Sequence, residues 1–183
     1  MRGEGVRRLF FALWPDEALQ RRMAGLVHAL AGGPDDPGGR PVHPEDLHAT
    51  LVFLGRVTPE QYPCVLAAAD AVAAAPFELS IDRMEHWRRS RVLWCGPHET
   101  PAALTRLFLD LRDGLKACGF PPEQRPYAPH VTLVRDGRPL APRPIEPGLI
   151  WRPSGFVLVE SLPVREPPRY RVVRSWAAQG RRL

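Results

Sequence analysis

The sequence predicts an α/β or α+β protein, and three observations support this. Apolar runs typical of strands alternate along the chain with amphipathic segments typical of helices. No linker is polar enough to separate domains, so we expect one domain over residues 1–183. Each half offers a strand, a helix and then a strand that begins His-x-Thr-Leu-Val, which indicates two similar lobes facing each other.

In the first half, residues 6–14 are apolar and aromatic and predict a strand. Residues 15–31 carry apolar side chains at helical spacing between an initial proline and a Gly-Gly stop. Residues 32–45 are rich in Pro, Gly and Asp and predict a loop. Residues 47–55 predict a second strand, and residues 58–74 predict a helix with one apolar face.

In the second half, residues 100–118 form the most regular amphipathic pattern and predict a helix that ends at Gly119. Residues 136–148 are proline-rich and predict a loop. The segments that predict strands are residues 77–84, 91–95, 130–135, 156–162 and 170–176.

The three cysteines, Cys64, Cys95 and Cys118, are scattered and form no C-x-x-C pair. Neither a disulfide framework nor a zinc knuckle is indicated by this spacing. We expect all three to be small buried residues.

The formal net charge of +5 suits a polyanionic partner such as RNA. Lys116 is the only lysine, however, and a GC-rich genome would give the same excess of arginine. The apolar run near the N-terminus ends at Pro15 without a signal-peptide cleavage site, and no segment reaches the ~20 apolar residues of a membrane span. We therefore expect a cytoplasmic monomer.

The two copies of His-x-Thr-Leu-Val, beginning at His48 and His130, carry the predicted chemistry. Residues i and i+2 of a strand point to the same face, so His48 projects with Thr50 and His130 projects with Thr132. One neutral imidazole can accept a proton while one imidazolium donates a proton, because histidine titrates near neutral pH. The threonine hydroxyls can donate hydrogen bonds to phosphate oxygens. The pattern predicts metal-independent acid–base catalysis at a phosphate.

Two other interpretations remain open. The histidines could be metal ligands, with Glu45 or Asp46 completing the set, although Asp136 is the only carboxylate near the second motif. The chain could also bind RNA ends without turnover, which would not require both histidines.

The chain resembles the 2H phosphoesterase superfamily, in particular the RNA 2′,3′-cyclic phosphodiesterases once called 2′-5′ RNA ligases. The matching segments occur in the same order over nearly the whole chain: RLFFAL at residues 8–13, LHATLVFLG at 47–55, RVLW at 91–94, RPYAPHVTLVR at 125–135 and FVLVES at 156–161. The resemblance implies a bilobal α+β fold of antiparallel sheet, with the helices outside and both motifs in a central cleft.

The resemblance also implies an activity and roles for the two histidines. It implies hydrolysis of a terminal RNA 2′,3′-cyclic phosphate to a 2′-phosphomonoester, without a cofactor. His48 would be the proton donor and His130 the proton acceptor, roles that the nearly identical motifs do not assign by themselves. A related substrate, such as a 2′-5′ linkage or another cyclic nucleotide phosphate, stays open.

Four further residues are candidates for substrate contacts. By strand parity Arg135 should face away from the cleft, but strands often bulge at their ends, and the resemblance favours Arg135 as a phosphate ligand. Arg125 and Tyr127 precede the second motif and are candidates for nucleotide contacts. Tyr127 or Phe11 could stack on a base, although a core position also suits Phe11.

Overall fold

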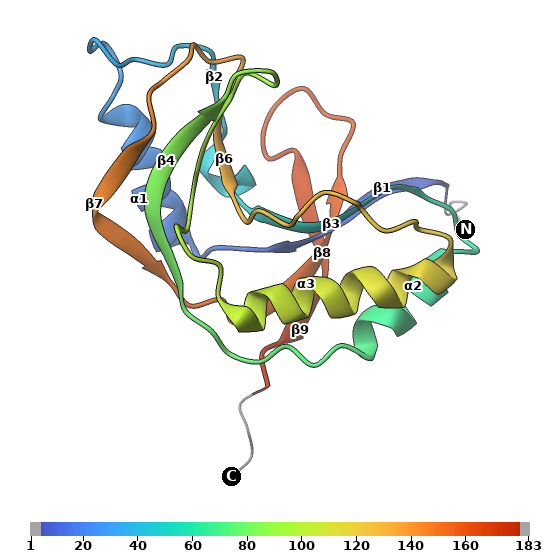
Figure 1. The fold of residues 1–183 in the computed structure, drawn as a ribbon. Coiled ribbons are helices and arrows are strands. Elements are labelled where there is room, and N and C mark those ends of the chain that lie inside the picture. Colours follow the sequence, from blue (N-terminus) through green and yellow to red (C-terminus); the bar gives the residue numbers. More distant parts are fainter. Residues whose placement is uncertain (1–4, 180–183) are drawn as a thin grey trace.

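The computed structural model describes residues 5–179, which form one nine-stranded sheet in which every strand pair is antiparallel (Figure 1). The strands are β1 (Arg7–Leu13), β2 (Arg40–Pro41), β3 (Ala49–Val57), β4 (Leu79–Trp87), β5 (Val92–Gly96), β6 (Val131–Arg135), β7 (Arg143–Trp151), β8 (Gly155–Ser161) and β9 (Tyr170–Ala177). The helices are α1 (Glu17–His28), α2 (Tyr62–Asp70) and α3 (Ala102–Leu115), with short 3₁₀ turns η1 (Pro44–Asp46) and η2 (Lys116–Cys118). The predicted α+β fold is confirmed.

The sheet consists of two four-stranded halves. One half has the order β3-β1-β8-β9 and the other has the order β7-β4-β5-β6, with β2 paired to β6. The halves join where β3 meets β6 through one pair, Ala49 opposite Val131. These two strands carry the two histidine motifs, so the join places the motifs next to each other.

Helices α1 and α3 each pack against the half of the sheet that does not contain the strand preceding them in the chain. Helix α1 follows β1 in the chain but packs against β6 and β7 of the other half, whereas α3 follows β5 and packs against β3 (Figure 1). Leu9, Phe11 and Leu13 of the central strand β1 are fully buried in the main core. Phe10 and Ala12, on the opposite face of β1, are buried in a second, smaller cluster. Both faces of the strand beside the first motif are therefore fixed by packing.

The predicted loop over residues 136–148 is partly wrong, because β7 begins within it at Arg143. Proline cannot donate to a sheet ladder, so Pro144 and Pro147 argued against a strand. Strand β7 lies at the edge of the sheet and pairs only with β4, and an edge strand tolerates missing donors. Within residues 5–179 no helix is both long and apolar enough to cross a membrane.

The prediction that the cysteines form no disulfide is also wrong. Cys64 in α2 is bonded to Cys118 in η2, and Cys95 is free and buried. The two cysteines are 54 residues apart and meet because α2 packs against α3 and η2. The spacing of the cysteines in the sequence therefore does not predict the disulfide. Disulfides are uncommon in cytoplasmic proteins, the compartment that the sequence led us to expect.

Closing a loop of this length restricts the unfolded chain, so we expect reduction of the Cys64–Cys118 bond to lower the free energy of unfolding by about 2–4 kcal/mol. Urea unfolding of the parent protein with and without dithiothreitol measures the difference. The matched control is the double variant Cys64→Ala/Cys118→Ala, whose stability should not respond to the reductant. Equal stability of the oxidised and reduced parent would contradict this expectation.

Candidate active site

Both motifs contain the same β-bulge at their leucine. In the pairing of β1 with β3, Phe11 lies opposite Val52 and Ala12 opposite Thr50, so Leu51 is an extra residue. In the pairing of β5 with β6, Leu133 is the extra residue in the same way. An inserted residue reverses the alternation of faces beyond it.

The bulge brings the fifth residue after each histidine onto the face of the histidine and threonine. In the second motif this residue is Arg135, which is exposed while Leu133 and Val134 are both buried. In the first motif it is Phe53, an aromatic side chain that is 57% exposed. Strict parity would have turned Arg135 away from the cleft, and the bulge explains why it lies on the cleft side.

The register of β3 against β6 interleaves the two motifs. Because Ala49 lies opposite Val131 in an antiparallel pair, His48 comes next to Thr132 and Thr50 comes next to His130. The cavities at the cleft agree with this arrangement, since one is lined by His48 with Thr132 and another by His130 with Thr50. Each histidine is therefore adjacent to the threonine of the other motif.

The backbone orients both imidazole rings in the same way. Nδ1 of His48 lies 2.6 Å from the carbonyl oxygen of Asp46, and Nδ1 of His130 lies 2.8 Å from that of Ala128. A carbonyl only accepts hydrogen bonds, so each Nδ1 carries a proton and donates it. In the neutral ring Nε2 is then the unprotonated nitrogen, free to accept a proton in the cleft.

Aromatic side chains enclose His48. Trp14 stacks parallel to its ring at 5.4 Å between centroids, Phe10 lies at 4.9 Å, and Tyr170 meets it edge-on at 5.0 Å. This burial lowers the pKa of His48 to about 4, with smaller lowering effects from the charges of Arg135 and His130 and an opposing effect of the Asp46 hydrogen bond.

Around His130 the enclosure is looser. Trp87 meets its ring edge-on at 4.5 Å and Trp94 lies at 6.1 Å. Burial is the main cause that lowers the pKa of His130, and the charge of Arg135 lowers it further. The surroundings of both rings therefore favour the neutral form at pH 7.

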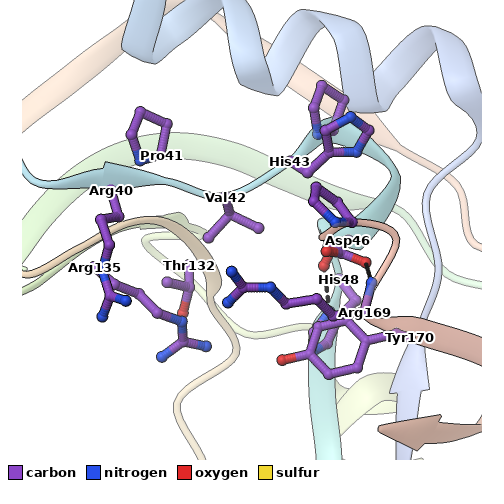
Figure 2. A pocket seen from close by; sticks show the side chains of 12 residues that line it. Arg40, Pro41, Val42, His43, Asp46, His48, Thr132, Arg135, Arg169 and Tyr170 are labelled. Carbon is purple, nitrogen blue, oxygen red and sulfur yellow. Dashed lines mark hydrogen bonds between the residues drawn. The ribbon is translucent and has the colours of Figure 1, made fainter. Parts of the chain in front are cut away.

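Three cavities meet at the motifs. The Arg169 pocket, of about 340 Å³, is bordered by Arg40, Arg135 and Arg169 as well as His48 and Thr132. Figure 2 shows the side chains of Arg135, Arg169 and Thr132 extending toward the same space. This pocket combines cationic side chains with the apolar Val42 and the ring of Tyr170, a mixture that suits an anionic nucleotide.

The Arg8 groove, of about 760 Å³, runs from His48 and Thr50 past Phe53 to Arg8. On the other side of the motifs the His130 pocket, of about 630 Å³, is mainly apolar and is bordered by Trp87, Phe108 and Phe120. Arginines therefore line both sides of the cleft, but on the side of His130 they are Arg112 and Arg125, which pair with Asp113 and Glu123.

The three remaining candidates for nucleotide contacts differ in how far they are buried. Phe11 is fully buried and packs against Phe156 and Trp176, so it does not reach the cleft, and stacking of Phe11 on a base is wrong. Tyr127 lines the His130 pocket, but its hydroxyl donates to the carbonyl of Thr50 and its ring stacks on Phe108. Arg125 lines the rim of the same pocket and pairs with Glu123.

The sequence did not reveal the residues that enclose His48. Arg169 ends the loop before β9 and Tyr170 is the first residue of β9, and no sequence motif includes either of them. The backbone N–H of Arg169 donates to the buried Asp46 carboxylate. This bond ties the loop before β9 to η1. Phe53 could have been found by comparing the fifth position of the two motifs.

A metal site finds little support in the side chains of the described residues. Within residues 5–179 no three His, Cys, Asp or Glu side chains gather closely enough to hold a metal ion. Asp46, considered above as a ligand beside His48, directs its carboxylate to the backbone N–H of Arg169.

Known proteins share both the sequence pattern and the fold. The model of the LigT-like phosphoesterase family matches residues 13–94 and 96–148. The chain is 34% identical over 174 residues to the RNA 2′,3′-cyclic phosphodiesterase of Escherichia coli K12, covering 93% of this chain and 96% of that protein. It is 33% identical to the protein of the same name from Thermus thermophilus, covering 94% and 91%. The crystal structure of E. coli LigT in complex with 3′-AMP superposes with a TM-score of 0.85 at 30% identity, covering 94% of this chain and 98% of that one.

Because the charge of Arg135 lowers the pKa of both histidines, we expect the variant Arg135→Gln to raise both values in the empty protein. NMR titration of the imidazole resonances measures the two values. Arg138→Gln is the matched control, since Arg138 is exposed nearby and bonded to the carbonyl of Asp36. Equal histidine titrations in the parent and in Arg135→Gln would contradict the proposed position of this charge.

Proposed function

The chain belongs to the LigT-like phosphoesterase family, and we propose that it hydrolyses the 2′,3′-cyclic phosphate at the end of an RNA to a 2′-phosphomonoester. The observation that carries the proposal is the interleaving of the motifs. Two imidazoles, each held by a backbone carbonyl at Nδ1 and each beside the other motif's threonine, meet in a cleft with cationic walls. All these groups come from one chain, so we propose a monomer as the active form.

The two sides of the cleft support opposite roles for the histidines. Arg135, which lines both cavities at His48, has no ion pair within residues 5–179 and suits the anionic RNA. The His130 pocket also has two arginines in its lining, but Arg112 pairs with Asp113 and Arg125 pairs with Glu123. In displacement at phosphorus the attacking and leaving oxygens lie roughly in line. With the nucleoside on the side of His48, water attacks from the side of His130. This arrangement supports His48 as the proton donor and His130 as the proton acceptor.

The proposed reaction needs no group beyond the chain and water. Nε2 of His130 takes a proton from water as the water oxygen forms a bond to phosphorus. The bond from phosphorus to O3′ breaks, and Nε2 of protonated His48 donates its proton to O3′. The product carries a phosphate on O2′ and a free 3′-hydroxyl, and the histidines regain their starting protonation through solvent.

Thr50, Thr132 and Arg135 would hold the phosphate during this step. The hydroxyl groups donate to the non-bridging oxygens, and the guanidinium offsets the charge that builds on them. Phe53, exposed between the Arg8 groove and the His130 pocket, offers a face on which the terminal base can stack.

We expect His48→Gln and His130→Gln each to lower turnover of an RNA 2′,3′-cyclic phosphate by about 10²–10⁴-fold, the usual contribution of one general acid or base. Glutamine keeps much of the side-chain volume, which limits damage to the aromatic enclosure of His48. Product release is followed in excess EDTA, in which the parent should remain active because metal-binding clusters are absent from residues 5–179.

The matched control is His98→Gln, because His98 is an exposed histidine between β5 and α3, away from the cleft. It should keep parental turnover, and thermal unfolding should show that all three variants are folded. A parent that binds the RNA without releasing product would leave the protein as an RNA end-binding module.

The pH dependence should differ between kcat/KM and kcat. The reaction needs one protonated and one neutral histidine, and kcat/KM reports the titration of the free enzyme. Since the pKa of His48 is lowered to about 4 and that of His130 is also lowered, kcat/KM should peak below pH 6.5 and fall as pH rises further. The bound anion raises both pKa values, so the kcat optimum should lie at higher pH. Coincident profiles, or a kcat/KM optimum above pH 7, would contradict the buried-histidine mechanism. The acidic and alkaline limbs of each profile report apparent pKa values of the two histidines as a coupled pair, and neither limb is assigned to one residue.

A further inference from the structure

Two arginines face each other where β1 and β3 leave the cleft. Arg8 lies directly opposite Arg56 in the antiparallel ladder, and both side chains are exposed. Opposite residues share one face with Cβ atoms about 4.5–5.5 Å apart, where like charges destabilise a sheet. Over residues 5–179 neither guanidinium has a carboxylate at ion-pair distance, whereas the adjacent Arg7 pairs with Glu160 at 2.9 Å. An external anion would relieve this repulsion.

Arg8 connects the arginine pair to the catalytic cleft. Arg8 lines the Arg8 groove together with His48, and its guanidinium carbon lies 5.3 Å from the ring centroid of Phe53. Phe10 lies two residues further along the same face of β1 and contacts the His48 ring at 4.9 Å. From the level of Thr50, which is opposite Ala12, four strand residues span about 14 Å to Arg8.

We propose that Arg8 and Arg56 bind the sugar–phosphate backbone of the RNA upstream of its cyclic end, which makes an RNA chain a better substrate than a mononucleotide. The inference rests on the proposed function. A stacked strand rises about 3.4 Å per nucleotide, so the pair lies within about four nucleotides of the cyclic phosphate. Guanidinium groups match phosphate geometry and carry no base preference of their own.

The surroundings of the pair favour this occupant. Glu160, the carboxylate that lines the same groove, is engaged by both Arg7 and Arg171 and so does not compete for the pair. The strands β1 and β3 run side by side between the motifs and the start of β1 (Figure 1), and the exposed side chains of Arg8, Phe53 and Arg56 lie along this path for the RNA. The contact is to the backbone, so it should not depend on the RNA sequence.

The test compares two substrates in the parent and in Arg56→Gln, namely an RNA decamer with a 2′,3′-cyclic phosphate end and adenosine 2′,3′-cyclic phosphate. We expect kcat/KM for the decamer to fall about threefold to tenfold and kcat/KM for the mononucleotide to stay unchanged. The slope of log kcat/KM against log salt for the decamer should become shallower by about 0.7 for the lost contact. Thermal stability should be equal or higher, because a like-charge pair is removed.

Arg21→Gln is the matched control, since it removes the same charge from the exposed face of α1. Three results would overturn the proposal: an unchanged decamer rate and salt slope, an equal loss on both substrates, or an equal loss in Arg21→Gln. If the parent turns over neither substrate, the proposed function fails. Fluorescence anisotropy with a labelled decamer then tests the arginine pair separately, and equal affinity of parent and Arg56→Gln would reject it.

Discussion

The antiparallel contact between Ala49 and Val131 is the constraint on which the rest of the site depends. It is the single residue pair that joins β3 to β6, and both side chains are buried. Sliding one strand by one residue would turn its apolar set outward and its histidine into the core. The contact thus fixes how the two halves of the sheet meet and, with the same register, which threonine stands beside which histidine. The same contact therefore sets the fold and the candidate active site, because the side chains proposed to be catalytic occupy alternate positions of these two strands.

The environment of His48 favours its neutral form, so the proposed role as proton donor requires the substrate to favour protonation. The rings of Phe10, Trp14 and Tyr170 exclude water and lower its pKa, while the carbonyl of Asp46 keeps Nδ1 protonated. The imidazole of His48 is therefore mostly neutral at pH 7. A phosphate anion beside Nε2 opposes the desolvation and favours the charged form. In the proposed mechanism, loss of the proton to the leaving oxygen returns the ring to the neutral form that its apolar surroundings favour. The anion would thus supply the charged form of His48, and burial would favour transfer of its proton to the leaving oxygen.

Much of the fold could be predicted from the sequence, and the failures have physical causes. Each of the seven predicted strands and three predicted helices is recognisable from the spacing of apolar residues within its own segment, and the repeated motif is enough to locate both histidines. Strand β7 is not predicted because it contains Pro144 and Pro147, and proline is tolerated in a strand only at the edge of a sheet. The residues of the strand itself do not reveal that it lies at an edge. The Cys64–Cys118 bond was missed for the same reason. The sequence allows a bulge near Arg135 but does not identify Leu133 as the extra residue, because Leu-Val is equally typical of a regular strand.

The two motifs are nearly symmetric, yet the chemistry proposed for them needs one donor and one acceptor. The bulge puts the fifth residue of each motif on the cleft face, and there the sequence differs, with Phe53 in one motif and Arg135 in the other. The loop that ends at Tyr170 closes over His48, whereas Trp87 leaves His130 more open. The backbone therefore gives both imidazoles the same orientation, with each Nδ1 donating to a carbonyl oxygen. In the proposed mechanism, the residues that differ between the two motifs would place the nucleoside and the water on different sides of the phosphate. That difference would set the direction of proton transfer.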